Sequence, residues 1–289
     1  MNTSSPVITR RSLLGAGAGA VALAGIGPVQ TSQALATAAT YAKLVADPVF
    51  YVAHRGGGGD WPEMTNYAYR HAVQLPAIKA LEVSVRLTAD NVLVCSHDDN
   101  LLRTTGKDLF VSKETWATLS TLKVDASETN QPSQLPRNFS RFDDVLAAFM
   151  DNYVLYVEPK TTSANAPLMQ RMVGLGQPQR VVWKQPINST VFAQAKSNGF
   201  ATWGYVLNEA GHLGTNLTRY AASKSIDMLG VPRAQPDAFV TTVVQAAKAN
   251  GKKTMMWEIR NVADRTRAIK LGCSGMMTSG VTAVTSTPL

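Results

Sequence analysis

Strand-like and helical patterns alternate along most of this chain, and that alternation limits the possible folds more than any other feature. The strand-like runs are short, apolar and rich in β-branched or aromatic residues. They lie at Phe50–Ala53, Ala80–Val85, Leu155–Val157, Arg180–Trp183, Thr202–Val206, Met228–Val231, Thr254–Ile259 and Gly275–Thr278. Helical patterns separate them at Asn66–Leu75, Phe142–Met150, Pro167–Val173, Ser189–Asn198, Leu217–Lys224, Ala238–Asn250 and Val262–Leu271. This order predicts an α/β protein whose parallel strands form a (β/α)₈ TIM barrel.

One further strand-like run does not fit the alternation. Val92–His97 follows Val83–Leu87 after only four residues. A parallel neighbour needs a crossover of about a dozen residues or more, so we expect an antiparallel hairpin after the second barrel strand. If its turn centres near Asp90–Asn91, His97 returns opposite about Val83. We expect the next segment, Leu102–Arg141, to be an irregular insertion over the same face of the barrel.

The first 36 residues have the pattern of an export signal. Arg10 and Arg11 are their only charges, the apolar run Leu13–Ile26 follows, and Ala34–Ala36 fits an A-x-A cleavage site. The alternative is a membrane anchor, but the run is short of the roughly 20 residues that span a bilayer. The segment around the arginine pair resembles the twin-arginine export motif. We therefore expect residues 1–36 to be a removed signal, residues 37–289 to be the barrel, and the protein to be secreted or on the cell-envelope side, without stable membrane insertion.

Composition narrows the classes of partner. Without Arg10 and Arg11 the chain has 26 basic and 20 acidic side chains, a mild excess that favours anionic ligands. No run of five Lys or Arg residues occurs, so no nucleic-acid surface is expected. The length suits one barrel or two small domains, and no linker-like stretch divides it. We expect a monomer, and we expect Cys95 and Cys273 to stay unpaired because they lie at opposite ends of the barrel.

Chemically distinctive residues follow several of the predicted strands. The carboxyl ends of barrel strands line the active site in this fold, and Glu82 and Ser84 share one strand face because they are two residues apart. The glycines Gly56–Gly59 allow backbone amides to approach an anion. Each charge alone could be a solvated surface residue, but together they predict a functional site. Its members are His54, Arg55, Glu63, Glu82, Ser84, His97, Glu158, Lys160 and Trp257. We interpret His71 and His212 as surface residues.

These stretches together resemble the glycerophosphodiester phosphodiesterase family over nearly all of residues 37–289. The matching residues are His54–Gly56, Pro62–Glu63, Glu82, Thr88–Asn91, Ser96–Asp98, Leu102–Thr105, Glu158–Lys160, Trp257 and Gly275–Ser279. The resemblance implies a (β/α)₈ barrel that cleaves a small-molecule glycerophosphodiester to glycerol 3-phosphate and an alcohol with the aid of a divalent cation.

The resemblance also implies roles for individual residues. His54 and His97 are expected to be the general acid/base pair, since imidazole titrates near working pH. Arg55 and Lys160 are expected to bind the substrate phosphate. Trp257 is expected to pack against the glycerol carbons. The residues expected to hold Ca²⁺ or Mg²⁺ are Glu82, Glu158, Ser84 and Glu63.

Three positions depart from the family pattern. Ser84 stands where the family has the Asp of a Glu-x-Asp pair, Met64 replaces an Asn, and Ser279 replaces an Asp. A hydroxyl carries no charge, so we expect a weakened metal site. Two alternatives stay open: a phospholipase D-like member of the same barrel group that acts on lysophospholipid or sphingomyelin, and a barrel that binds phosphodiesters without cleaving them.

Overall fold

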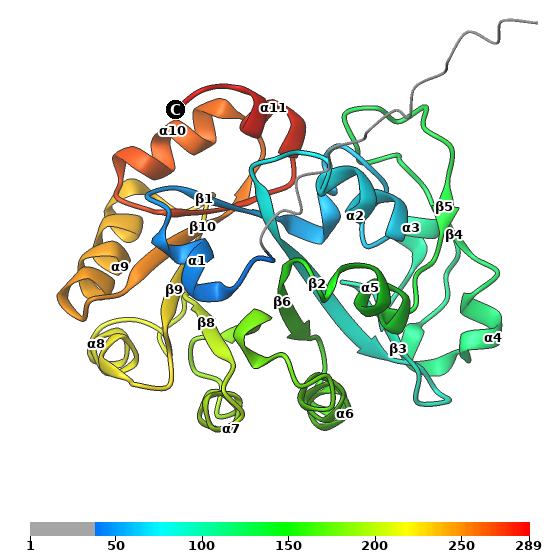
Figure 1. Cartoon of the computed structure of the whole chain (residues 1–289), viewed down its shortest axis with the longest axis horizontal. Helices are drawn as coiled ribbons and strands as arrows, with labels where there is room; N and C mark the ends of the chain where they lie inside the picture. Colours follow the sequence, from blue (N-terminus) through cyan, green and yellow to red (C-terminus); the bar gives the residue numbers. More distant parts are fainter. Residues whose placement is uncertain (1–37) are drawn as a thin grey trace, which may run out of the picture. The chain divides into compact units, whose positions relative to one another are not determined.

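The computed structural model describes residues 38–289, and their main feature is a closed ring of eight parallel strands (Figure 1). The ring order is β1, β2, β6, β7, β8, β9, β10 and β11, and β11 pairs with β1 to close it. The strands are β1 (Phe50–Ala53), β2 (Ile78–Leu87), β6 (Val154–Pro159), β7 (Val181–Pro186), β8 (Ala201–Tyr205), β9 (Met228–Pro232), β10 (Lys253–Ile259) and β11 (Gly275–Thr278). The predicted TIM barrel is confirmed.

Helices follow the strands around the outside of the ring (Figure 1). They are α2 (Asn66–Ala72), α5 (Phe142–Phe149), α6 (Thr162–Val173), α7 (Phe192–Ser197), α8 (Thr215–Ala222), α9 (Asp237–Ala249), α10 (Val262–Lys270) and α11 (Val281–Ser286). Helix α9 shows why they form: Val240, Val243, Val244 and Ala247 recur at helical spacing and are all buried. Helix α11 and the short α1 (Tyr41–Ala46) were not predicted from the sequence.

Strand alternation divides the core into two clusters. In β2, Leu81 and Val83 pack into the outer cluster between strands and helices, whereas Ala80 belongs to the inner cluster inside the ring. Side chains two residues apart point the same way, so Glu82 and Ser84 follow Ala80 into the ring. Leu44 of α1 also belongs to the inner cluster. Apolar side chains therefore fill the ring up to the level where the polar residues begin.

The hairpin prediction is confirmed. Strand β3 (Leu93–Cys95) pairs antiparallel with β2, with Val85 opposite Cys95. The Ser96 amide donates to the Ser84 carbonyl at 3.0 Å. His97 follows directly after this bond, so the hairpin returns it to the end of β2, close to where the connection length predicted.

The insertion after the hairpin covers the barrel mouth but is more ordered than predicted. It contains α3 (Leu102–Thr105), η2 (Val111–Lys113), α4 (Trp116–Leu119) and the strand pair β4 (Lys123–Val124) and β5 (Arg137–Asn138). The insertion is ordered because it has an apolar cluster of its own, made of Val94, Leu101, Val111, Leu119, Val124 and Phe139. The Asn130 amide donates to the Gly59 carbonyl at 2.7 Å, which ties the insertion to the loop after β1.

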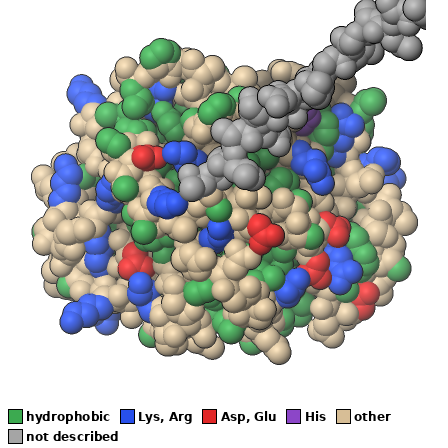
Figure 2. Space-filling model, viewed as in Figure 1, with side chains coloured by type: hydrophobic (Ala, Val, Ile, Leu, Met, Phe, Trp, Pro, Cys, Tyr) green, Lys and Arg blue, Asp and Glu red, His purple; other side chains and the backbone are tan. Residues whose placement is uncertain are grey.

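Two short 3₁₀ helices, η1 (His54–Gly56) and η3 (Pro178–Arg180), complete the elements. Cys95 and Cys273 are buried and unpaired, as predicted. Among residues 38–289, no helix is both long and apolar enough to cross a bilayer. The predicted export signal lies outside the described residues. On the face seen in Figure 2, lysines and arginines are scattered among acidic and uncharged side chains and form no single patch.

The surface assignment of His212 was wrong. This residue is 1% exposed, and its Nδ1 accepts a hydrogen bond from the Leu207 amide at 3.0 Å. The bond closes the loop between β8 and α8, so His212 serves the structure of that loop. His71 on α2 is half-buried and stacks on Trp61, with ring centroids 5.4 Å apart.

Candidate active site

His54 lies where β1 turns into η1, at the carboxyl end of the ring. It is 3% exposed, and its Nδ1 is 2.9 Å from the Ser279 hydroxyl, which follows β11. Arg55 has a left-handed backbone, with φ of 54°. This conformation directs its amide to Glu82, whose Oε2 accepts a hydrogen bond at 2.9 Å. The strained residue thereby couples the first strand to the second.

The glycine loop serves packing, in contrast to the expectation that its amides bind an anion. Gly57 and Gly58 donate to the His54 carbonyl at 2.9 and 3.1 Å, and Gly59 donates to the Ser279 carbonyl at 3.0 Å. Gly57 has φ of +87°, and a Cβ there would overlap the Val281 side chain. Glycine is therefore required where the loop approaches the last strand and α11.

His97 enters the site from the hairpin and contacts two charged groups. Its Nδ1 is 2.7 Å from Asp98 Oδ1, and its Nε2 is 3.2 Å from the Lys160 ammonium. The Asp98 carboxylate can only accept, so Nδ1 carries the proton and Nε2 is left as the acceptor. Arg86 holds the backbone here, donating to the His97 carbonyl at 2.9 and 3.1 Å.

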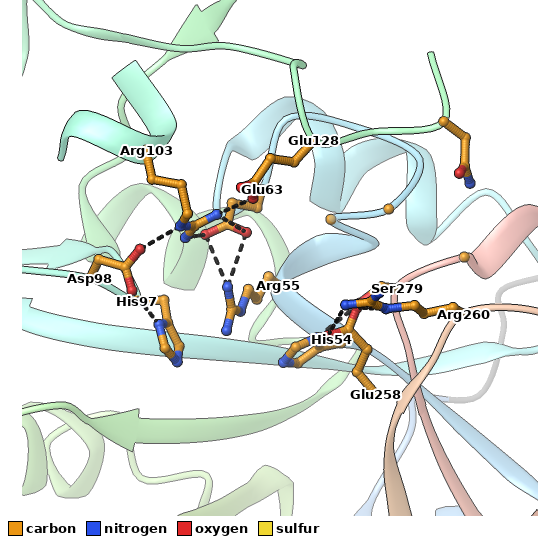
Figure 3. A pocket seen from close by; sticks show the side chains of 14 residues that line it. His54, Arg55, Glu63, His97, Asp98, Arg103, Glu128, Glu258, Arg260 and Ser279 are labelled. Atoms are coloured by element: carbon orange, nitrogen blue, oxygen red, sulfur yellow. Dashed lines mark hydrogen bonds and ion pairs between the residues drawn. The ribbon is translucent and has the colours of Figure 1, made fainter. Parts of the chain in front are cut away.

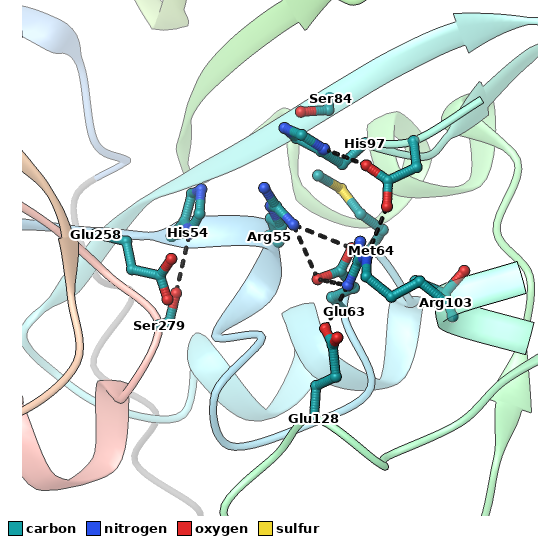
Figure 4. A network of polar contacts seen from close by, with 12 residues as sticks. His54, Arg55, Glu63, Met64, Ser84, His97, Arg103, Glu128, Glu258 and Ser279 are labelled. Atoms are coloured by element: carbon teal, nitrogen blue, oxygen red, sulfur yellow. Dashed lines mark hydrogen bonds and ion pairs between the residues drawn. The ribbon is translucent and has the colours of Figure 1, made fainter. Parts of the chain in front are cut away.

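A layer of arginines and carboxylates lies across one side of the site (Figure 4). Glu63 pairs with Arg55 at 3.1 Å and with Arg103 at 2.7 Å. Arg103 continues to Asp98 at 2.6 Å and also pairs with Glu128 of the insertion. Glu63 thus lies with two arginines, apart from Glu82 and Glu158. The sequence analysis quoted Arg103 within a matching motif but gave it no role.

The floor of the site is a buried group of four residues, Glu82, Ser84, Glu158 and Lys184, each at most 5% exposed. The Lys184 ammonium lies 2.7 Å from Glu82 Oε1 and 2.8 Å from Glu158 Oε2. The Ser84 hydroxyl is 3.2 Å from the first carboxylate and 3.3 Å from the second. Glu158 also receives hydrogen bonds from Lys160 at 3.2 Å and Tyr205 at 3.0 Å.

Sequence reasoning missed Lys184, although a signal was present. The predicted strand ended at Trp183, whereas β7 continues through Lys184 to Pro186. Lys184 is two residues beyond Val182, which belongs to the inner cluster, so alternation alone would have directed it into the ring. Its place near the carboxyl end of a barrel strand is the second half of the same signal.

The cation expected from the family resemblance does not fit these donors. Ca²⁺ and Mg²⁺ need several oxygen ligands, but an ammonium already lies against one oxygen of each carboxylate. The other two oxygens are also engaged, by the Arg55 amide and by Lys160. Within residues 38–289, no group of three or more His, Cys, Asp and Glu side chains is arranged to hold a metal ion.

The surroundings tune the proton affinities of the two histidines differently. Burial, followed by the nearby charges of Arg55 and Lys184, holds the pKa of His54 well below its usual value. Burial also lowers the pKa of His97, but there the hydrogen bond to Asp98 opposes it. In the floor, burial acts to raise the pKa of Glu158, and Lys184 and then Lys160 outweigh it, lowering that pKa to about 2.

A cavity of about 630 Å³ opens beside His54 and His97 (Figure 3), and its lining includes neither the four floor residues nor Lys160. Every residue that lines it is polar, charged or glycine: His54, Arg55, Gly58, Gly59, Glu63, His97, Asp98, Arg103, Glu128, Asn130, Glu258, Arg260, Ser279 and Gly280. Trp257 is not among them. It is half-buried and packs edge-on against Trp203 and Tyr205, with ring centroids 5.4 and 5.3 Å apart.

Several known proteins are similar to this chain in sequence or fold. The chain is 23% identical over 258 residues to the glycerophosphodiester phosphodiesterase of Bacillus subtilis, which covers 82% of this chain and 85% of the relative. It is 40% identical over 62 residues to human lysophospholipase D GDPD1, covering 22% of this chain and 19% of that protein. The fold is similar to an Oleispira antarctica phosphodiesterase solved with the product sn-glycerol-3-phosphate, with a TM-score of 0.63, 21% identity, and 84% and 98% of the two chains covered.

The family assignment rests on a family model that matches most of the chain. Residues 54–282 match the glycerophosphoryl diester phosphodiesterase family, from His54 to the start of α11. This range includes every residue that the sequence placed in the site. The chain therefore belongs to the glycerophosphoryl diester phosphodiesterase family, as its sequence predicted.

Proposed function

We propose that this protein hydrolyses glycerophosphodiesters to glycerol 3-phosphate and an alcohol, with His54 and His97 as the proton-transfer pair. One observation carries the proposal: two histidines line the same cavity and have different hydrogen-bond partners. His54 has a neutral hydroxyl partner, and His97 has a carboxylate partner. A displacement that removes a proton on one side and delivers one on the other needs such a pair.

His54 is suited to act as the base. Its burial and neighbouring positive charges keep it deprotonated at neutral pH. A free imidazole nitrogen can then accept the proton of the glycerol hydroxyl that attacks phosphorus. That attack expels the alcohol and leaves a cyclic phosphodiester, which water opens to give glycerol 3-phosphate.

His97 is suited to act as the acid. Asp98 stabilises its protonated form, and the carboxylate of Asp98 is itself kept charged because its hydrogen bonds to His97 and Arg103 lower its pKa. A phosphodiester bound beside His97 adds a further negative charge that favours the imidazolium. Nε2 then delivers its proton to the departing alcohol oxygen.

Arg55 and Lys160 are placed to bind the phosphoryl group. Arg55 lines the cavity between the two histidines, and the Lys160 ammonium contacts His97 Nε2. Arg offers a fork of donors and Lys a point charge, and both stabilise the charge that grows on phosphoryl oxygens. Trp257, with its half-buried ring, is the proposed contact for the glycerol carbons.

The cavity favours a polar alcohol as leaving group. No aliphatic or aromatic hydrocarbon side chain lines it within the part of the chain that the structure describes. An acyl chain needs an apolar surface to leave water, so a lysophospholipid or sphingomyelin is the less favoured substrate. The short match to a lysophospholipase D keeps that alternative as an arm of the test.

Members of this family generally use a divalent metal. The donors in this site do not fit one, so no step of the proposed reaction uses Ca²⁺ or Mg²⁺. We also propose that the protein acts outside the cytoplasm, after removal of the twin-arginine-type segment in residues 1–36.

A substrate panel tests the proposed activity. Glycerophosphocholine, glycerophosphoglycerol and lysophosphatidylcholine are incubated with the protein. Glycerol 3-phosphate release from the first two is measured with a coupled dehydrogenase, and choline release from lysophosphatidylcholine is measured with a coupled oxidase. We expect release from the first two. Isothermal titration with the same compounds separates catalysis from binding alone, since saturable heat without release would favour a non-catalytic barrel.

A further inference from the structure

We infer that Lys184 takes the place of the divalent cation in this protein, so that its phosphodiesterase site works without a metal. The inference rests on the proposed function and deepens it. It names the residue that supplies the central positive charge of the floor, where the family generally places a metal.

The position of the ammonium is the first argument. Lys184 Nζ lies between one oxygen of Glu82 and one of Glu158, at 2.7 and 2.8 Å, as a bound cation would. Its side chain is 6% exposed, and the face of the Trp203 ring lies 5.6 Å below the ammonium. A buried ammonium needs paired counter-charges, and these two carboxylates provide them.

The charge count is the second argument. Glu82 and Glu158 carry two negative charges, and Lys184 and Lys160 carry two positive ones within hydrogen-bond distance of them. The floor together with Lys160 is therefore neutral. A divalent ion added between the same oxygens would lie against two ammonium groups, and like charges at such distances repel strongly in a buried site.

The hydroxyl of Ser84 is the third argument. It lies within 3.3 Å of both carboxylates, and as their neighbour it acts as a hydrogen-bond donor. An aspartate there would be a third negative charge, which Lys184 and Lys160 together could not balance. The departure at position 84 and the lysine at position 184 thus compensate each other.

Lys184 also positions the groups that face the substrate. Glu158 connects it to Lys160 and from there to His97 Nε2, with contacts of 3.2 Å at both steps. Glu82 connects it to the Arg55 amide at 2.9 Å. Lys184 is therefore a positioning residue that orients both phosphate-binding cations through two carboxylates, which is the arrangement a central metal would also provide.

Direct cation binding tests this without any substrate. The protein is dialysed against chelator, then titrated with Ca²⁺, Mg²⁺ and Mn²⁺ by calorimetry. We expect no saturable binding up to about 1 mM, the range in which even weak calcium sites begin to fill. Saturable binding of one ion below that level, together with loss of turnover on chelation, would overturn the inference.

Lys184→Gln is the informative variant, with Lys196→Gln as its control. Removing the ammonium uncovers two adjacent carboxylates, so we expect Lys184→Gln to bind a divalent ion with a dissociation constant of about 10⁻⁴–10⁻³ M. Adding Ser84→Asp should tighten binding at least about tenfold, because a third carboxylate joins the site. Lys196 pairs with Asp227 at 2.9 Å on the outside of the barrel, and its loss should create no binding.

The readouts separate the two proposals. Two results together support the role of Lys184. The parent protein turns over substrate without a metal, and Lys184→Gln binds an added divalent cation, which raises its melting temperature. Turnover that requires a cation refutes that role and leaves the proposed function intact. If no phosphodiester is cleaved, the proposed function fails, and the cation titrations still decide the role of Lys184. If Lys184→Gln does not fold, the titration of the parent protein decides alone.

Discussion

Asp98→Asn tests whether the pair of His97 and Asp98 works as a proton donor. The carboxylate lies 2.7 Å from His97 Nδ1, and an amide of the same shape can replace it. The substitution removes the negative charge that stabilises the imidazolium. It also permits the amide nitrogen to donate to Nδ1, which would place the proton of a neutral His97 on Nε2.

The size of the effect follows from the geometry. Opposite charges about 4 Å apart attract by about 4 kcal/mol at an effective dielectric constant of about 20 and by about 1 kcal/mol in water. The two side chains are 30% and 32% exposed. We therefore take an intermediate value of about 2 kcal/mol, which corresponds to about a 30-fold loss in kcat. Arg103 keeps its contacts with Glu63 and Glu128, so the free energy of unfolding should change little.

The pH dependence gives the sharper result. Loss of the negative charge destabilises the imidazolium, so the pKa of His97 falls in the variant. If His97 is the acid, its proton is lost at lower pH and the alkaline limb of the kcat/KM profile moves to lower pH. If His97 were the base, the acid limb would move to lower pH and the alkaline limb would stay.

The assay is a kcat/KM profile with glycerophosphocholine over the range in which the protein is folded. Asp99→Asn is the matched control, because the neighbouring carboxylate pairs with Arg86 and Ser112 and not with the histidine. A variant Asp98→Asn that keeps the parent kcat and the parent alkaline limb would refute the proton-donor role of this pair.

Four further predictions concern the remaining histidines, Ser279 and the thiols. His54→Ala and His97→Ala should each lower kcat by about 10²–10⁴. A substrate with a very acidic leaving group should restore turnover only in His97→Ala. An equal loss of kcat in His71→Ala would indicate an effect on folding instead. Ser279→Asp places a carboxylate beside His54 Nδ1, which lies 2.9 Å from the Ser279 hydroxyl in the parent protein. The carboxylate should raise the pKa of His54 and move the acid limb of the kcat/KM profile to higher pH. An acid limb that does not move would exclude His54 as the base. His212→Ala leaves a buried backbone amide without its acceptor and should lower the free energy of unfolding by about 1–3 kcal/mol in urea, with kcat unchanged. The denatured, unreduced protein should titrate with two thiols, and fewer would contradict the barrel topology.

Local sequence patterns determined the architecture. The spacing of apolar residues separated strands from helices along the chain, and the strand at Phe50–Ala53 and the strand at Gly275–Thr278 have the predicted bounds. These patterns suffice because each element must bury its apolar face, and the period of that face depends only on neighbouring residues. The short α1 escaped prediction because it is only six residues long and shows one buried residue, Leu44.

Connection length determined one tertiary contact. Four residues between two strands allow only a hairpin, and the hairpin register carries His97 to the barrel mouth. The same argument could not show that Asp98 and Lys160 contact the two nitrogens of the His97 imidazole. The directions of their side chains depend on the neighbouring loop and strand. The family resemblance supplied the residue types, and the structure supplied their partners.

Only the tertiary structure decided how the charges pair. Lys184 and Glu82 are 102 positions apart in the chain, and Ser279 and His54 are 225 apart. Strand alternation from Val182 could have directed Lys184 into the ring, but nothing local in the sequence identifies the two carboxylates that it meets there. Closure of the barrel brings these groups together, and burial then makes each charge depend on a specific partner. The sequence by itself therefore determined the barrel and most of the polar residues at the carboxyl ends of its strands, whereas the closed fold decided that the Lys184 ammonium lies between the two carboxylates.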